Sequence, residues 1–229
     1  MIRFAVTLIL GLLCFAILVS LGNWQMRRMG EKEAYLAEVA ALIDAAPVAV
    51  PDTPDPVQHR FLPVSVNGTF TGETVRVLVS HKKMGAGYRL ITALDTDAGR
   101  IMVDRGFIRV ADAQPALPVG EVTVTGNLHW PEERDGYTPE NDLTENIWFA
   151  REVPVLAAHL QADPVLVIAR STSFVDPQVT PLGVGTEGIP NDHLEYVVTW
   201  YGLAAVWLLM LGLFLWRMYK SARKPLKEI

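Results

Sequence analysis

Two long runs of uncharged, apolar residues constrain this chain more than any other feature of its sequence. Residues 4–21 form an 18-residue run without a charge, and residues 196–216 form a 21-residue run without one. At about 1.5 Å per residue, these runs make helices of about 27 and 31 Å, which match the ~30 Å hydrocarbon core of a bilayer. We therefore predict transmembrane helices at 4–23 and 191–216. This pattern excludes a simple soluble enzyme, a disordered chain and a multi-pass transporter.

Each run has an alternative interpretation. The first run resembles a cleaved signal peptide, but it is longer than the usual apolar region, and Ser20-Leu21-Gly22 is a poor cleavage site, so we expect a retained anchor. The second run resembles a buried core helix, but several of its aromatic residues lie near its ends, as in the aromatic belts of membrane spans. The aromatic residues of this region are Trp200, Tyr201, Trp207, Trp216 and Tyr219.

The net charge of −5 is an average over two very different parts of the chain. Residues 25–195 carry −10, whereas the tail 217–229 carries +4. The basic tail predicts a cytoplasmic C-terminus. Its cations outweigh the opposing signal of the three that follow the first span, Arg27, Arg28 and Lys32. Two spans place residues 1–3 in the cytoplasm as well, so the intervening domain is exported. The acidity of that domain excludes nucleic acid as a partner.

The compartment follows from the same topology. The exported domain lies in the periplasm of a bacterium or in the mitochondrial intermembrane space. Only three residues precede the first apolar run, which is too short for a transit peptide. We therefore expect a bacterial inner membrane protein with a periplasmic domain.

The exported part divides into three segments by composition. Residues 24–46 predict a juxtamembrane helix, 47–57 a proline-rich linker and 58–190 a β-rich domain. Period-two alternation predicts six strands, at 62–70, 75–79, 88–94, 101–110, 122–128 and 165–169, and a helix at 153–160. The short connections favour antiparallel pairing. The predicted class is a membrane protein with two transmembrane helices around an α+β domain, built on an antiparallel six-stranded sheet or barrel.

The sequence offers no constellation of catalytic residues. The phosphate-binding loop G-x-x-x-x-G-K-[ST], the nucleophile motif G-x-S-x-G and the zinc motif H-E-x-x-H are absent. The single cysteine, Cys14, lies inside the first apolar run and excludes a disulfide framework. The carboxylate-rich stretch 132–136 is typical of a solvated loop. We therefore expect a protein that is not an enzyme.

One histidine is a candidate metal ligand. The spacing of Asp192 and Glu195 approximates a capping box and places His193 in the first turn of the second span, at the exported face of the membrane. The N-terminal end of a helix disfavours a protonated imidazole, so a neutral ring able to bind metal is plausible there. The residues three, four and seven positions further on, which share its face, are Tyr196, Val197 and Trp200. Haem iron takes an axial imidazole beside such a surface. The alternative is a histidine that lies in the headgroup region of the membrane and binds no metal.

Several motifs, in this order, resemble the surfeit locus protein 1 family of cytochrome c oxidase assembly factors, over nearly the whole chain. The motifs are Leu21-Gly22-Asn23-Trp24-Gln25-Met26-Arg27-Arg28 with Lys32, Pro63-Val64 with Gly68 and Phe70, Gly87-Tyr88, Val103-Asp104-Arg105-Gly106-Phe107, and Pro190-Asn191-Asp192-His193-Leu194-Glu195-Tyr196 with Thr199-Trp200. The first and last motifs are the specific ones. Asp104 and Asp192 depart from the family, which usually has Asn there, and Phe107 stands where it has Trp.

The resemblance implies an assembly factor that binds haem a transiently and assists its insertion into subunit I of cytochrome c oxidase. The implied partners are subunit I, haem a synthase and the lipid bilayer. His193 is then the candidate axial ligand of the haem iron, and Tyr196 and Trp200 are candidate haem contacts. The other candidates for contact with haem or a partner are Trp24, Gln25, Arg27 and Arg105.

Alternatives remain for these roles. Arg105 either meets a haem propionate, because a guanidinium pairs well with a carboxylate, or forms an internal salt bridge. Trp24 and Gln25 either contact haem or anchor the helix at the membrane interface. The alternative function is a membrane-anchored scaffold that stabilises an oxidase assembly intermediate and binds no cofactor.

Overall fold

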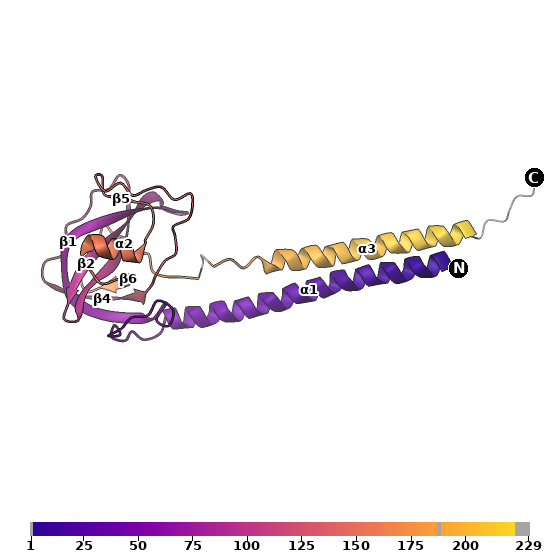
Figure 1. The fold of residues 1–229 in the computed structure, drawn as a ribbon, viewed down its shortest axis with the longest axis horizontal. Helices are drawn as coiled ribbons and strands as arrows, with labels where there is room; N and C mark the ends of the chain where they lie inside the picture. The colour runs from indigo at the N-terminus through magenta and orange to yellow at the C-terminus, as the bar shows by residue number, and fades with distance from the viewer. Residues whose placement is uncertain (1, 187–188, 223–229) are drawn as a thin grey trace, which may run out of the picture. The chain divides into compact units, whose positions relative to one another are not determined.

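The structure, a computed structural model, describes residues 2–186 and 189–222, and the chain divides into two compact units (Figure 1). The helical unit contains α1 (Ile2–Ile43) as far as Glu38, together with α3 (His193–Ala222). The β domain comprises residues 39–186. Parts of three predicted segments lie outside the described residues: position 1 of the N-terminal segment, 187–188 of the exported domain and 223–229 of the basic tail.

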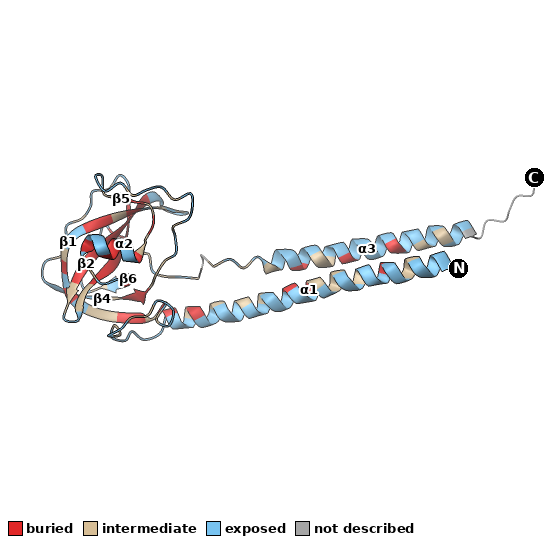
Figure 2. Cartoon of the chain, in the orientation of Figure 1, coloured by how far each residue is buried: buried red, intermediate tan, exposed pale blue. Residues whose placement is uncertain are grey.

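The two helices of the helical unit run antiparallel. Gly11 of α1 lies against Leu211 of α3, and Gly22 lies against Tyr201. Both helices are long and apolar enough to cross a membrane, and most of their apolar side chains are exposed (Figure 2). Because the 42 residues of α1 span about 63 Å, twice the thickness of a hydrocarbon core, α1 continues well beyond its apolar part.

The start of α3 differs in detail from the expected capping box. The backbone N–H of Glu195 donates to the Asp192 carbonyl oxygen at 3.2 Å. Within the described part of the chain, the Asp192 carboxylate makes no hydrogen bond, so the helix end is closed by the backbone. His193 is nevertheless the first residue of the helix.

The β domain is a closed barrel with one short helix. The elements are β1 (Pro63–His81), β2 (Gly85–Thr96), β3 (Gly99–Arg109), β4 (Glu121–Leu128), β5 (Ile147–Trp148), α2 (Val153–Leu160) and β6 (Leu166–Thr172). The strand order is β2-β3-β6-β4-β1-β5, and β1 also pairs with β2, so five strands close on themselves. The predicted class, two apolar helices flanking a six-stranded α+β domain, is confirmed.

The sheet corrects two expectations. It is mixed rather than antiparallel throughout, because β3 pairs with β6 in parallel and β1 pairs with β5 in parallel. The long connection through α2 lets β6 return in the direction of β3, which a tight hairpin cannot do. The strands predicted at 62–70 and 75–79 are one strand, β1, with a register shift between Thr71 and Thr74.

β1 is long enough to pair with both β4 and β2, and these two pairings close the barrel. Gly72 and Glu73 stand opposite no residue of β2, so β1 bulges there and bends instead of ending. Residues 63–69 pair with β4, and residues 69–71 and 74–81 pair with β2, so the pairing with β2 continues across the bulge. Strand β5 was not predicted, because its two residues are too few to show a period-two pattern.

The core of the β domain lies on both faces of the strands. On β3, Val103 belongs to one buried cluster and Met102 to another. The second cluster includes the apolar face of α2, with Leu156 fully buried, and the indole of Trp148. α2 therefore covers strand residues that would otherwise face solvent (Figure 2).

Candidate functional site

The two helices bring together two residues that are 168 positions apart in the chain. His193 Nδ1, at the start of α3, lies 2.8 Å from Gln25 Oε1 on α1. Gln25 is 8% exposed and His193 is partly buried. With Oε1 facing the ring, the tautomer that satisfies this contact carries its proton on Nδ1, which leaves the Nε2 lone pair available. Nε2 has no hydrogen-bond partner among the described residues.

A second hydrogen bond and a close approach hold the helices in register beside this pair. The Tyr201 hydroxyl donates to Asn23 Oδ1 at 2.6 Å. A Cβ at Gly22 would lie 2.9 Å from the Tyr201 ring, so only glycine allows this approach. The motif at residues 21–25 therefore contributes three neighbouring positions, Gly22, Asn23 and Gln25, to the packing of α1 on α3.

The aromatic residues predicted around His193 are present on its side of α3. Tyr196 is 53% exposed and Trp200 is partly buried, while Val197 between them is buried. At about 100° per residue, the face that carries His193 includes all three. The result is a histidine with a free ring nitrogen beside aromatic surface.

Trp24 and Arg27 are exposed residues of α1 that take no part in the contact between Gln25 and His193. Trp24 is 48% exposed and Arg27 is exposed. Arg27 follows Gln25 by two positions, about 200° around the helix, so it does not share the face that carries Gln25. Arg27 forms no ion pair within the described part of the chain. Of the predicted set, the structure thus joins Gln25 to His193 and leaves Arg27 exposed.

Arg105 belongs to the β domain, where it is 4% exposed. Its Nη2 donates to Asp176 Oδ2 at 2.5 Å, and its guanidinium carbon lies 5.6 Å from the centre of the Phe70 ring. The internal salt bridge, one of the two interpretations of Arg105, is therefore present. A role for Arg105 toward a propionate stays a prediction.

The other residues of the motif at 103–107 also have structural roles. Val103 is buried in the core, and Phe107 exchanges two backbone hydrogen bonds with Thr180. Gly106 has φ of 125°, and a Cβ there would lie 2.4 Å from the Thr180 carbonyl oxygen, so the position needs glycine. The motif therefore holds the segment around Thr180 against the barrel through backbone hydrogen bonds and close packing.

Asp104 is fully buried and is paired with two arginines. Its Oδ2 lies 2.5 Å from Arg89 Nε and 3.3 Å from Arg151 Nη1. Its Oδ1 accepts the backbone N–H of Gly106 at 3.1 Å. Arg151 also pairs with Glu133, so the carboxylate-rich stretch 132–136 is not simply a solvated loop. Although burial works in the opposite direction, the hydrogen bond from Arg151 lowers the pKa of Glu133.

His129 lies close to this ionic cluster without belonging to it. Its ring stacks on Phe61 with centroids 5.1 Å apart, and its buried Nδ1 has no hydrogen-bond partner within residues 2–186 and 189–222. Burial, reinforced by the positive charge of Arg151, lowers the pKa of His129 to about 4. His129 is therefore neutral in the folded protein at all but acidic pH.

This shift predicts a pH-dependent stability. Between pH 6.5 and 4 the unfolded chain binds a proton at His129 that the folded chain does not bind, so the free energy of unfolding falls as the pH falls through this window. Because the ring is partly exposed, we expect a loss on the order of 1–2 kcal/mol. His129→Phe, which keeps a ring on Phe61, should lack that part of the loss.

Thermal unfolding of the full-length protein at pH 7 and pH 4.5 measures this difference. His81→Gln, at the end of β1, serves as the control and should keep the wild-type pH dependence. Equal pH dependence in His129→Phe and wild type contradicts the prediction.

Sequence reasoning missed the partners rather than the central residues. It named Gln25 and His193 but not their hydrogen bond, and it did not name Tyr201 as the partner of Asn23. It also missed Arg151. A polar residue in the otherwise apolar stripe of a membrane helix was the available signal, because such residues seek partners on neighbouring helices.

These features define a class: a membrane protein with two candidate spanning helices around a small β-barrel domain, with a histidine and a glutamine joined near one end of the helix pair. The SURF1 family model matches residues 12–205, which is most of the chain. A SURF1-like protein of Monosiga brevicollis is 31% identical over 211 residues, covering 83% of this chain and 80% of that protein.

Further relatives come from animals and bacteria. Surfeit locus protein 1 of Homo sapiens is 30% identical over 210 residues, covering 81% of this chain and 69% of the human protein. A SURF1-like protein of Rickettsia bellii is 29% identical over 212 residues, covering 85% and 84%. The chain belongs to the SURF1 family, as its motifs predict. At the level of the family, this membership supports a role as a membrane-bound assembly factor for the oxidase.

Proposed function

We propose that this protein binds haem a transiently and assists its insertion into subunit I of cytochrome c oxidase. The observation that carries the proposal is the 2.8 Å contact between His193 Nδ1 and Gln25 Oε1. Histidines that bind metal commonly donate their second ring N–H to an acceptor that fixes the tautomer. His193 has this arrangement, and its Nε2 is the nitrogen that would bind the iron.

The surroundings of His193 suit a large apolar ligand with acidic groups. Tyr196 and Trp200 supply aromatic surface on the same face of α3, and Trp24 is an exposed indole on α1. Arg27 is an exposed cation without an ion-pair partner among the described residues, which makes it a better candidate for a haem propionate than Arg105, already paired with Asp176.

Haem a is the cargo in this proposal, and the protein acts as an assembly factor rather than as an enzyme. A single histidine ligand on a partly exposed site favours exchange over permanent retention. The proposed partners are subunit I, which receives the haem, and haem a synthase, which supplies it. In the proposed topology both termini are cytoplasmic and the β domain is periplasmic, because the cations Arg217 and Lys220 follow the second span.

The decisive experiment is an optical spectrum of the full-length protein, purified from cells that also make haem a. We expect the absorption bands of bound haem a. A colourless protein that still captures oxidase subunits would overturn haem binding and leave the scaffold function. A colourless protein that captures no subunit would contradict both.

A further inference from the structure

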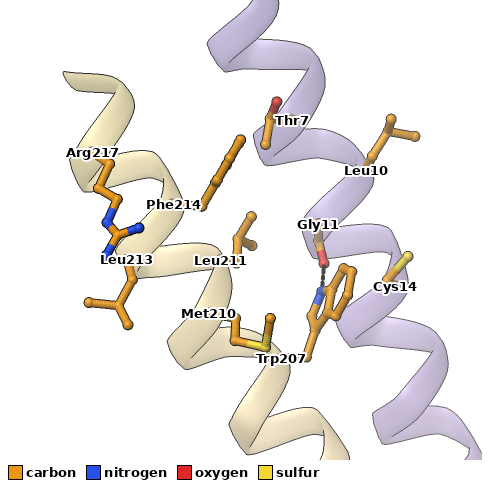
Figure 3. A pocket seen from close by; sticks show the side chains of 10 residues that line it. All are labelled: Thr7, Leu10, Gly11, Cys14, Trp207, Met210, Leu211, Leu213, Phe214 and Arg217. Carbon is orange, nitrogen blue, oxygen red and sulfur yellow. Dashed lines mark hydrogen bonds between the residues drawn. The ribbon is translucent and has the colours of Figure 1, made fainter. Parts of the chain in front are cut away.

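The helical unit contains a second feature that the proposed function does not use. A groove of about 570 Å³ lies between the spans (Figure 3). Its lining residues on α3 begin at Trp207, 14 positions after His193. Its volume falls within the roughly 300–1,000 Å³ of small-molecule sites. We call it the interhelical groove. It is lined by Thr7, Leu10, Gly11, Cys14, Trp207, Met210, Leu211, Leu213, Phe214 and Arg217.

The helices meet closely on one side of the groove, and this contact fixes its wall. A Cβ at Gly11 would lie 2.4 Å from Leu211 Cδ1, so α3 approaches α1 there as only glycine permits. The Trp207 Nε1–H donates to the Gly11 carbonyl oxygen at 2.8 Å, as the dashed line in Figure 3 shows. The indole is thereby held across the gap between the helices, and its polar N–H is satisfied inside the membrane.

The length of the groove along the helices matches the thickness of one leaflet of the hydrocarbon core. Trp207 and Arg217 are ten residues apart on α3, which corresponds to about 15 Å along the helix axis. The hydrocarbon core of a bilayer is about 30 Å thick, so this length matches half of it. Between these two residues the lining from α3 is apolar. An extended acyl chain fits a slot of this length and polarity.

The mouth of the groove carries a positive charge that no residue within 2–186 and 189–222 neutralises. Arg217 lines the groove and forms no ion pair with any residue that the structure describes. Acidic residues are absent from 2–30 and from 196–222, the parts of the sequence that form the spans and their ends. The neighbouring cation Lys220 lies 4.2 Å from the centre of the Trp216 ring. The anion that pairs with Arg217 must therefore come from outside the helices.

We propose that the interhelical groove binds one acyl chain of an anionic phospholipid, with the lipid phosphate paired to Arg217. A free phosphate ion accounts for the arginine but leaves the apolar slot empty. A transmembrane helix of another protein accounts for the apolar slot, but it pairs with Arg217 only if it also places a carboxylate at that end of the groove. An anionic lipid satisfies both, and basic pockets between membrane helices are known to bind such head groups.

Native mass spectrometry of the full-length, delipidated protein in detergent tests this site. The probes are dioleoylphosphatidylglycerol and dioleoylphosphatidylcholine, which share acyl chains and differ in net charge. We expect wild type to retain one phosphatidylglycerol in preference to phosphatidylcholine. Arg217→Gln should lower that retention about fivefold, the effect of one cation near a membrane surface. Lys220→Gln, the matched control on the same helix, should retain the lipid as wild type does.

A third variant separates the slot from the charge. Thr7→Trp keeps Arg217 but places an indole in the groove, so we expect retention of both lipids to fall. Thermal unfolding of each variant reports whether the helical unit stays folded. Equal retention of the two lipids by wild type, equal retention by Arg217→Gln and Lys220→Gln, or displacement of the lipid by millimolar inorganic phosphate overturns the proposal. Absence of retained lipid in wild type overturns it as well, and favours a partner helix.

Discussion

His193→Ala is expected to lower the haem a that copurifies with the protein about tenfold or more, because it removes the proposed iron ligand while leaving the aromatic surface in place. The measurement is the ratio of haem absorbance to protein in material made alongside haem a synthesis. His81→Ala, a histidine of the β domain, is the matched control and should leave the ratio unchanged. If His193→Ala retained the wild-type spectrum, the proposed ligand would be wrong even if the protein still bound haem.

Gln25 allows a sharper version of the same test. Gln25→Leu fills the buried position but removes the acceptor for the Nδ1–H of His193, so we expect haem affinity to fall about 10–100-fold although the ligand remains. Gln25→Glu restores an acceptor, and its charge raises the basicity of the ring, so binding should recover while the reduction potential of the haem falls. Glu31→Gln changes an exposed residue of the same helix on another face and should alter neither the potential nor the ligand spectrum.

The outcome for Gln25→Leu distinguishes a positioning role from a merely structural one. A structural role predicts lower thermal stability with an unchanged potential in the haem that remains. A positioning role predicts a changed potential and spectrum. Wild-type affinity and potential in Gln25→Leu would contradict the positioning role.

The sequence anticipated the spans and the general nature of the domain, because both depend on local patterns. An uncharged run of 21 residues has few alternatives to a membrane helix, so α3 was expected from composition alone. The helix at 153–160 and most of the strands follow from periodicity. His193 followed from its place at a helix start.

The features that sequence reasoning missed all depend on distant pairings. Periodicity shows which face of α1 carries Gln25, but it does not fix how α1 is aligned with α3, and that alignment brings Gln25 to His193. The parallel pairing of β3 with β6 depends on the long return through α2. The continuity of β1 across Gly72 and Glu73 depends on β2, which pairs with β1 on both sides of these two residues. The sequence predicted two separate strands here, at 62–70 and 75–79, whereas pairing with β2 on both sides makes one strand with a bulge.

Asp104 shows how a departure from a family pattern can be explained by its partners. The family pattern that residues 103–107 resemble has Asn here, whereas this chain has a carboxylate that is fully buried between Arg89 and Arg151. The two arginine side chains are only 11% and 13% exposed, so both need a counter-charge. Here a negative charge at 104 suits the two arginines better than a neutral amide.

This arrangement predicts a large loss of stability when the carboxylate is removed. Asp104→Ala leaves Arg89 and Arg151 buried near each other without their shared partner, and the N–H of Gly106 loses its acceptor. Breaking a buried ion pair in this way costs about 3–5 kcal/mol, so we expect the free energy of unfolding to fall by that amount. Asp104→Asn keeps one acceptor oxygen, which accepts either from the Gly106 N–H or from an arginine, so its cost should be smaller.

The β domain contains a matched control for the effect of burial. Asp95 pairs with Arg100 at 2.6 Å, nearly the same distance as Asp104 with Arg89, but the Asp95 side chain is 44% exposed. Water solvates Arg100 when Asp95 is replaced, so Asp95→Ala should cost less than about 1 kcal/mol. Chemical denaturation of the full-length protein, followed by tryptophan fluorescence, compares the two alanine variants. Equal costs would show that the arginines around Asp104 find water or other partners, and that burial does not give this pair its importance.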